Sequence, residues 1–369
     1  MAEPLKSYVN EAVVRRIAAL IRVVLPSFDE AVFIRLAVDG LEELELIPRA
    51  KHITVCLKQA LPQDPEEAIS ILVQAVTSEH SPGRLPGMES FFYYPFVHFV
   101  AQYGLGCFQT SLGALHELTR LFTSEFGIRP FLSHYPEATL TELHVWATDP
   151  NEHVRRLVSE GTRPRLPWAL RLPRFQEDPG PVLDLLEKLK DDPSEYVRRS
   201  VANNLNDISK DHPELVLKVT SAWWNDGDNT RRKLVKHALR TQIKAGNPQA
   251  LSILGYGSHS AIQVSSLSCT PQLVSIGGKV QIEVLLKNPT EGEAAGLIDL
   301  RIHFVKSNGF RSAKVFKGKE VVLAPEATTS FKRTISVAQQ TTRTHYPGEH
   351  LVEVVINGQV VISSSFIVG

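Results

Sequence analysis

Cysteine is scarce in this chain of 369 residues, and long apolar runs are missing. The three cysteines, Cys56, Cys107 and Cys269, are too few and too scattered for a disulfide framework or a CxxC metal site. No stretch reaches the roughly 18 apolar residues that a membrane span requires, and charged residues precede any apolar run at the N-terminus. We therefore expect a cytoplasmic protein in a reducing compartment, without membrane contact.

Motifs for cofactor or metal chemistry are missing as well. The sequence holds no GxGxxG, P-loop, HExxH or GxSxG segment, and its 13 histidines show no ligand spacing. These absences predict a protein with no cofactor and no metal. Because no symmetric apolar surface is apparent, we also expect a monomer.

Net charge is absent only when the whole chain is counted, with 40 Lys+Arg against 40 Asp+Glu. Residues 1–154 carry 11 basic and 19 acidic side chains, residues 155–244 carry 18 and 13, and residues 245–369 carry 11 and 8. The net charges of the three segments are therefore −8, +5 and +3. An acidic segment followed by two basic ones indicates a polyanion-binding surface within a neutral total.

The sequence does contain a repeat. Over residues 1–245, apolar residues recur at helical spacing, with Pro, Gly or Asp between the segments. DPNEHVRRLVSEG begins at Asp149, DPSEYVRRSVANNL begins at Asp192, and a third copy, DNTRRKLVKHALR, begins at Asp228. A period of roughly 40 residues is typical of HEAT-like helical pairs. We predict an all-α HEAT-like repeat solenoid for this region.

The pattern changes after Gly246. Residues 246–262 contain Gly, Ser and Pro and are predicted to form a linker. Beyond them, short runs of alternating apolar and polar residues are separated by turn signals such as Asn308-Gly309 and Asn357-Gly358. About seven short strands in residues 263–369 predict an all-β immunoglobulin-like sandwich domain.

The repeat helices share a polar face rich in arginine. On a helical wheel, Arg156 and Glu160 point together, away from the apolar side. Stacked repeats would align the equivalent positions, and arginine suits the phosphate oxygens of a duplex. The expected DNA-binding residues of this region are Arg155, Arg156, Arg163, Arg165, Arg199, Asn203, Arg232 and Lys236. A structural pair between repeats is the alternative for each arginine.

Glu125 falls within an apolar arc of the helix predicted for LGALHELTRLFTSEFGIRPF. Burying an unpaired carboxylate would cost several kcal/mol, so this side chain is either paired or used in chemistry. Arg129 lies four residues further on. The residues alone favour a structural Glu125–Arg129 pair slightly over a catalytic role.

The segment SEGTRPRLPW joins Glu160 to Trp168 through a loop with two prolines and two arginines. Such a loop could present the indole for stacking on a base or a sugar, with the carboxylate nearby. Ordinary packing of Trp168 between repeats is the alternative. Asp207 lies near the end of the second repeat helix, where an aspartate is usually solvated or caps the helix.

One hairpin of the β-region is basic. Its positive residues alternate with phenylalanines around the Asn308-Gly309 turn, which suits phosphate contacts or insertion into a groove. Lysines that protect an edge strand from aggregation look similar. The expected DNA-binding residues here are Lys306, Arg311, Lys314 and Lys317.

The chain resembles the AlkC branch of the bacterial DNA alkylation repair glycosylases. The resemblance extends from about residue 4 to the C-terminus. It is carried by PLKSYVNEAVV, LTRLFTSEFGIRPFL, DPNEHVRRLVSEGTRPRLPW, DPSEYVRRSVANNLNDISKDHP and FVKSNGFRSAKVFKGKE. It implies a HEAT-like superhelix followed by an immunoglobulin-like domain, with double-stranded DNA containing alkylated bases as the partner. The related AlkD branch lacks the β-domain.

The resemblance also implies an activity, the excision of 3-methyladenine and 3-methylcytosine. By motif, the family's catalytic acids fall on Glu125 and Glu160, with Asp207 as a third carboxylate and Trp168 as the aromatic residue of the site. A methylated base is cationic and leaves as a neutral molecule, so the enzyme mainly stabilises the oxocarbenium-like sugar and positions water. The duplex would be bent rather than read through a deep base pocket.

Two rival functions stay open. The chain could be a HEAT-repeat scaffold that binds a protein partner, or a non-catalytic module that binds damaged DNA. Glycosylase chemistry requires the three carboxylates and Trp168 to converge. The scaffold predicts that Glu125, Glu160 and Asp207 are dispersed and individually replaceable, whereas the damage-binding module predicts salt-sensitive DNA binding without base release.

Overall fold

A computed structural model describes residues 4–257, 260–340 and 343–369. The chain divides into two compact units, Met1–Asp211 and His212–Gly369. The first is helical, and the second combines the last four helices with all of the β-strands that the structure describes.

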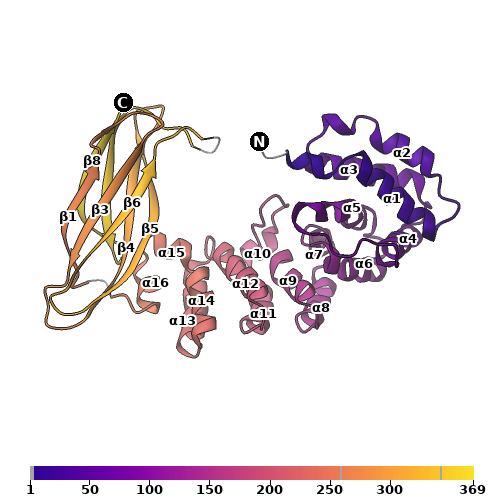
Figure 1. Cartoon of the computed structure of the whole chain (residues 1–369). Helices are drawn as coiled ribbons and strands as arrows, with labels where there is room; N and C mark the ends of the chain where they lie inside the picture. The colour runs from indigo at the N-terminus through magenta and orange to yellow at the C-terminus, as the bar shows by residue number, and fades with distance from the viewer. Residues whose placement is uncertain (1–3, 258–259, 341–342) are drawn as a thin grey trace. The chain divides into compact units, whose positions relative to one another are not determined.

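The helices of the first unit run from indigo to magenta in Figure 1. Short 3-10 helices cover Leu5–Tyr8, Leu41–Glu43 and Gly87–Tyr93. The α-helices are α1 (Glu11–Val24), α2 (Glu30–Val38), α3 (Leu46–Ala60), α4 (Pro65–Thr77), α5 (Tyr94–Tyr103), α6 (Phe108–Leu121), α7 (Arg129–His134), α8 (Pro136–Trp146), α9 (Glu152–Gly161), α10 (Pro173–Glu177), α11 (Gly180–Leu189) and α12 (Glu195–Ile208). No helix among the described residues is long and apolar enough to cross a membrane.

The first two copies of the sequence repeat form α9 and α12 and have the same local structure. Asp149 accepts a hydrogen bond from the Asn151 N–H at 2.7 Å, and Asp192 accepts one from the Ser194 N–H at 2.8 Å. Each aspartate thus forms a tight turn just before a helix, rather than capping the helix itself, because the N-cap residues are Asn151 and Ser194. Both helices therefore begin at the same point of the repeat, and α9 packs directly on α12.

The apolar sides of these two helices are buried as the wheel predicted. Val154, Leu157 and Val158 of α9 are at most 1% exposed. Val201 and Leu205 of α12 are fully buried. Burial of such side chains stabilises a fold by roughly 1.5–3 kcal/mol each, which holds neighbouring repeats together.

The second unit begins with four helices, α13 (Pro213–Asn225), α14 (Asn229–Ala238), α15 (Arg240–Lys244) and α16 (Pro248–Ile253). Helix α16 lies within residues 246–262, which were expected to be a linker. Asn247 caps it by accepting from the Gln249 and Ala250 N–H groups. Gly246 also approaches Gly358 of the β-region so closely that a Cβ on Gly358 would lie 2.8 Å from the Gly246 Cα. The boundaries 1–245, 246–262 and 263–369 remain a prediction about domain organisation.

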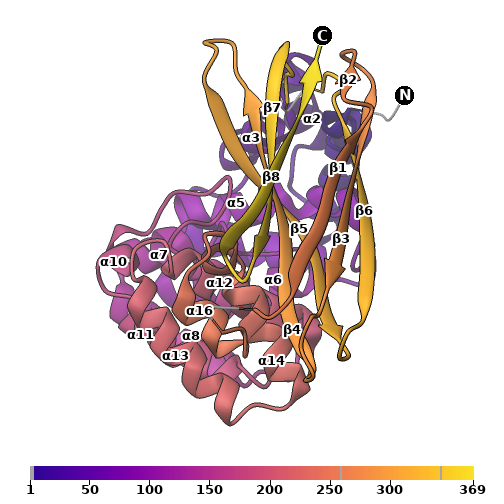
Figure 2. The ribbon, with the colours of Figure 1, turned by 90° about the vertical axis from the view of Figure 1, so that its left-hand side faces the viewer.

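The strands are β1 (Gln263–Thr270), β2 (Leu273–Val274), β3 (Lys279–Lys287), β4 (Ala294–Val305), β5 (Arg311–Leu323), β6 (Thr328–Ser336), β7 (Gly348–Ile356) and β8 (Gln359–Val368). They form a three-stranded sheet in the order β1-β3-β6 and a five-stranded sheet in the order β2-β8-β7-β4-β5. Figure 2 shows the strands of both sheets, with β1, β3 and β6 together. All pairs are antiparallel except β2 with β8. The predicted all-β immunoglobulin-like sandwich is confirmed.

The space between the two sheets is filled by aliphatic and aromatic side chains. On β3, Val280, Ile282, Val284 and Leu286 are fully buried, whereas the residues between them face outward. This alternation is the period-two pattern that the sequence displayed. The core of the second unit is therefore apolar.

Candidate active site

Glu125 does not lie on a helix. Helix α6 ends at Leu121, and Phe122 is extended at φ −149°. Two side-chain hydrogen bonds explain why the helix ends here. The Thr119 hydroxyl accepts from the Ser124 N–H, and the Ser124 hydroxyl donates to the Leu115 carbonyl. Glu125 therefore lies in the turn between α6 and α7. The prediction that it lies on the apolar face of a helix was wrong.

The expected Glu125–Arg129 pair is also wrong. Arg129 lies at the start of α7 and is 3% exposed, but its guanidinium donates to main-chain carbonyls, at 2.9 Å to Gly161 and at 2.9 Å to Arg163. Glu125 instead accepts from Arg156 at 2.6 Å, a partner 31 residues away on α9. The Thr123 hydroxyl donates to the same carboxylate oxygen at 2.7 Å.

Three carboxylates and two guanidinium groups form one continuous network, termed here the carboxylate–arginine network. Arg156 joins Glu125 at 2.6 Å to Glu160 at 3.6 Å. Arg163 then joins Glu160 at 2.6 Å to Asp207 at 2.8 Å. The structure thus brings together the three acids that the resemblance implied, from the α6–α7 turn, α9 and α12.

The network is largely withdrawn from solvent. The side chains of Glu160 and Asp207 are 7% and 4% exposed, and that of Glu125 is the most accessible of the three at 12%. Asp207 was expected to be solvated or capping, but it is buried because both of its oxygens are engaged, by Arg163 and by Lys210 at 2.9 Å. Arg156 also stacks over the Tyr196 ring, 5.1 Å from its centroid.

Glu160 is held ionised. Burial alone would raise its pKa, but the positive charges of Arg156 and Arg163 outweigh burial and lower the pKa below its ordinary value of 4.5. The Ser200 hydroxyl adds to this effect by donating to Glu160 at 2.6 Å, and it accepts in turn from Ser159 at 2.7 Å. A carboxyl group with a lowered pKa is a poor general acid and a good electrostatic stabiliser of a cation.

Trp168 stands out from the surface. The side chain is 83% exposed, so packing between repeats is excluded, and its backbone adopts a left-handed φ of 64°, which is uncommon for any residue except glycine. The loop that carries it follows α9 and includes Arg163, a member of the network. Leu170 on the same loop is 81% exposed. A strained, exposed aromatic residue on a loop that also carries an arginine of a buried polar network is typical of a functional site.

The arginines expected to bind DNA in the first unit have varied surroundings. Arg155 makes a bidentate pair with Asp192 at 2.6 and 2.9 Å, which links one repeat to the next. Arg165 makes a similar pair with Asp211 at 3.0 and 2.6 Å and keeps 26% of its side chain exposed. Arg199 is exposed on α12, and Asn203 is partly exposed one turn further on. DNA binding by these residues remains a prediction.

In the second unit, Arg232 covers the Trp224 ring at 5.4 Å, and Lys236 pairs with Glu320. The hairpin residues Lys306, Arg311, Lys314 and Lys317 are all exposed. Of these, Arg311 pairs with Glu349 at 2.6 Å, and Lys314 lies 5.3 Å from the centre of the Phe316 ring. Phe310, at the hairpin turn, is 75% exposed. These side chains could contact DNA, and that role also remains a prediction.

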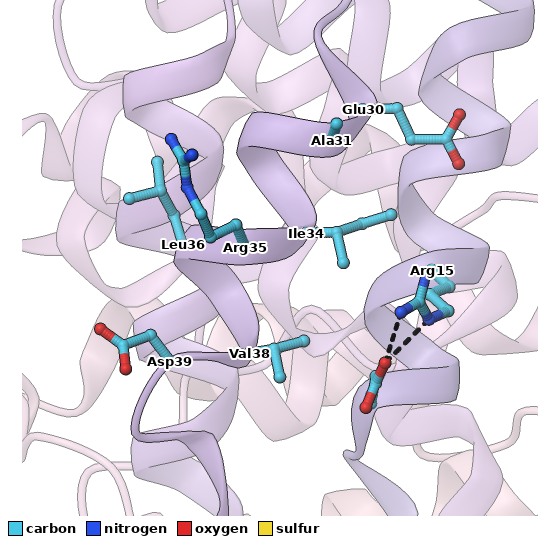
Figure 3. A pocket seen from close by; sticks show the side chains of 9 residues that line it. Arg15, Glu30, Ala31, Ile34, Arg35, Leu36, Val38 and Asp39 are labelled. Atoms are coloured by element: carbon cyan, nitrogen blue, oxygen red, sulfur yellow. Dashed lines mark hydrogen bonds and ion pairs between the residues drawn. The ribbon is translucent and has the colours of Figure 1, made fainter.

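A separate hollow of about 850 Å³ lies against α1 and α2. Figure 3 shows Arg15 at its wall, where Arg15 donates to Glu11, and Ile34 and Val38 nearby. None of the three network carboxylates lines this hollow. We therefore place no part of the candidate chemistry there.

Sequence reasoning missed Ser200 as a polar residue of the site and gave Arg129 the wrong partner. Ser200 could have been found, because the 43-residue repeat aligns it with the apolar Leu157 of the first copy. A hydroxyl where the repeat places a leucine indicates a polar partner across the interface. Arg129 carried no comparable signal, since its acceptors are carbonyls far away in the sequence.

Known proteins match the whole chain. A family described as "DNA alkylation repair enzyme" matches residues 122–241, and one described as "Uncharacterised protein YhaZ, C-terminal Ig-like domain" matches residues 263–369. The "Uncharacterized protein YhaZ" of Bacillus subtilis (strain 168) is 40% identical over 363 residues, 98% of each chain. The solved structure of Pseudomonas fluorescens alkylpurine DNA glycosylase AlkC, bound to DNA containing an abasic site analog, is 36% identical and matches 100% of both chains with a TM-score of 0.91. On these similarities, the chain belongs to the AlkC-type family of DNA alkylation repair enzymes.

Proposed function

We propose that this protein is a DNA glycosylase that removes the cationic bases 3-methyladenine and 3-methylcytosine from duplex DNA by hydrolysing the N-glycosidic bond. The observation that carries the proposal is the carboxylate–arginine network, in which Glu125, Glu160 and Asp207 converge. The similarity to the alkylpurine DNA glycosylase AlkC, solved with DNA containing an abasic site analog, supports the alkylated purine as a substrate.

The charge of the network fits this substrate. Arg156, Arg163 and Lys210 balance the three carboxylates, so the network has no excess charge, but its negative groups are held ionised at fixed positions. As the glycosidic bond breaks, positive charge moves from the base to the sugar. Fixed negative groups in a site of low dielectric stabilise such developing charge far more strongly than water does.

We assign the direct role to Glu125 and Glu160. Glu125 is the most accessible acid, and Glu160 is kept ionised by its neighbours. One of them would face the sugar and the other would orient the attacking water, as carboxylates do in glycoside hydrolysis. Asp207 lies at the opposite end of the network from Glu125 and is the least exposed of the three acids at 4%, so we assign it an indirect role through Arg163, which it holds against Glu160.

Trp168 would contact the deoxyribose or the base at the lesion. Stacking on an aromatic side chain contributes roughly 1–3 kcal/mol per base. Bending of the duplex would bring the lesion to the site without a deep pocket, at a cost of about 1–6 kcal/mol that phosphate contacts by the basic residues would offset. Monomeric action on double-stranded DNA is part of this proposal.

The test is chromatographic detection of free bases released from methylated duplex DNA. Release of 3-methyladenine and 3-methylcytosine by the native protein, with a sharp fall in Glu160→Gln and retained DNA binding, is the expected result. Binding without any release would identify a damage-binding module instead. Absence of both binding and release would favour a repeat scaffold for a protein partner.

A further inference from the structure

Arg129 is a buried guanidinium whose described partners are all main-chain carbonyls. It is 3% exposed and donates to Gly161 and Arg163 at 2.9 Å each. Its Nε donates to the Leu170 carbonyl at 2.8 Å, and a second nitrogen reaches the same oxygen. Among the described residues Arg129 makes no ion pair, although burying a charge is far less costly when a counter-charge is present.

The three carbonyls that accept from Arg129 lie on both sides of Trp168 in the sequence. Gly161 ends α9, Arg163 precedes Trp168, and Leu170 follows it. One side chain from α7 therefore ties both flanks of the loop to the end of the helix that carries Glu160. Within the loop the described backbone hydrogen bonds are those from Ala169 to Leu166 at 3.3 Å and from Leu172 to Pro164 at 3.2 Å, and neither of them reaches α7.

The local packing is arranged to let this contact form. A Cβ on Gly161 would lie 2.6 Å from the Ile128 side chain, so only glycine allows α9 to approach the start of α7 this closely. Burial lowers the pKa of Arg129 to about 10, and Arg163 adds to the lowering, while Glu125 and Asp207 oppose it. Arg129 therefore stays charged at neutral pH, despite the energetic cost of its position.

We propose that Arg129 is a positioning residue of the base-release site, which fixes the Trp168 loop so that the indole projects at the lesion. The inference rests on the proposed function of Trp168. A flexible loop would have to order Trp168 on each encounter with DNA, whereas a pinned loop presents it already oriented. The left-handed φ of Trp168 is the strain that such pinning would maintain.

A double-mutant cycle tests the proposal. Single-turnover base release is measured for the native protein, Arg129→Lys, Trp168→Ala and the double variant. We expect a loss of about tenfold in each single variant and no more than a twofold further loss when Arg129→Lys is added to Trp168→Ala. Losses that multiply in the double variant would overturn the proposal, since Arg129 would then act independently of the indole.

Arg49→Lys is the matched control. Arg49 is also buried, at 1% exposed, and donates to the Leu44 and Val9 carbonyls at 2.8 and 2.9 Å, but it lies on α3, outside the network and the Trp168 loop. The two lysine variants should lose similar thermal stability. Only Arg129→Lys should lose base release.

A second measurement requires no DNA. Trypsin cuts after Arg165 and the exposed Arg171 once the loop opens, and mass spectrometry locates the cuts. We expect Arg129→Lys to be cut in this loop at least fivefold faster than the native protein and Arg49→Lys. Unchanged cleavage would overturn the claim that Arg129 holds the loop. If the native protein releases no base, the proposed function fails, and cleavage alone still decides the role of Arg129.

Discussion

The interface between α9 and α12 and the core of the β-sandwich are both buried, but they are built from different chemistry. The sandwich packs residues such as Ile282, Leu300 and Val352, each fully buried. The helical interface instead buries charged and polar groups such as Glu160 and Asp207, each at most 5% exposed. Stability alone explains the apolar core of the sandwich, but it does not explain the buried charges of the helical interface.

The difference follows from what each type of burial contributes. Apolar area stabilises a fold by about 25 cal/mol per Å², without a geometric requirement. Buried ion pairs largely offset their own desolvation, and replacing them by apolar side chains is often neutral or stabilising. The buried acids and arginines therefore contribute little to stability. Their presence is explained better by a catalytic role, the stabilisation of a cationic transition state.

The largest expected effect concerns the charge of the substrate. Duplex DNA containing a neutral 3-deaza analogue of 3-methyladenine presents the same shape without the positive charge. We expect release to fall by more than a thousandfold, because an ionised Glu160 cannot donate the proton that a neutral base needs in order to leave. Single-turnover assays with both duplexes measure this ratio. Comparable rates would indicate a general acid.

The next prediction separates stability from activity. Ile302→Ala in the sandwich core should lower the free energy of unfolding by about 2–5 kcal/mol, with base release by the folded protein changed less than twofold. Ser200→Ala should lower stability by only about 1–3 kcal/mol, yet reduce base release about tenfold, because Glu160 loses a donor. Denaturant unfolding and base release measured on both variants provide the comparison. The reverse pattern would contradict the account.

A smaller effect is expected at Trp168. Trp168→Ala should reduce base release about tenfold, within the range expected for loss of one stacking contact. The indole is 83% exposed and buries little area, so thermal stability should change little. Trp168→Phe should recover most of the rate. A fall in stability that matched the fall in rate would point to a structural role.

The smallest expected effect is that of pH. The pKa of Glu160 lies below its ordinary value of 4.5, so the charge of this group is constant between pH 5 and pH 8. Its contribution to stability is fully present above pH 4.5 and is lost as the pH falls through the lowered pKa of the folded state. Base release should therefore be flat from pH 5 to pH 8. An acidic limb near pH 6 would show a protonated catalytic acid.

Local sequence patterns were enough to predict the fold. The Asp149 and Asp192 turns located the starts of α9 and α12, and alternation in Lys279–Lys287 located a strand, because both patterns depend on neighbours in the chain. The same local logic failed at Glu125. The hydroxyls of Thr119 and Ser124 compete for backbone groups and end the helix early, an effect that apolar periodicity does not reveal.

The site was predictable only in part. The spacing of Arg156 and Glu160 placed them on one helix face, and their ion pair agrees with this. The link from Arg156 to Glu125 spans 31 residues, and the contacts of Arg129 with the Trp168 flanks span 34 and 41. Such contacts depend on how neighbouring repeats pack. The sequence of a single repeat does not reveal that packing. The acids themselves were identified through the family resemblance.

The measurement that tests the central claim most directly compares two carboxylates. Glu160→Gln and Asp192→Asn each remove one charge from a buried ion pair, but Asp192 binds Arg155 outside the network. The account predicts a loss of base release of about a hundredfold or more in Glu160→Gln, with DNA affinity retained, and a loss below threefold in Asp192→Asn. Equal losses in both variants, in step with their thermal stability, would contradict it.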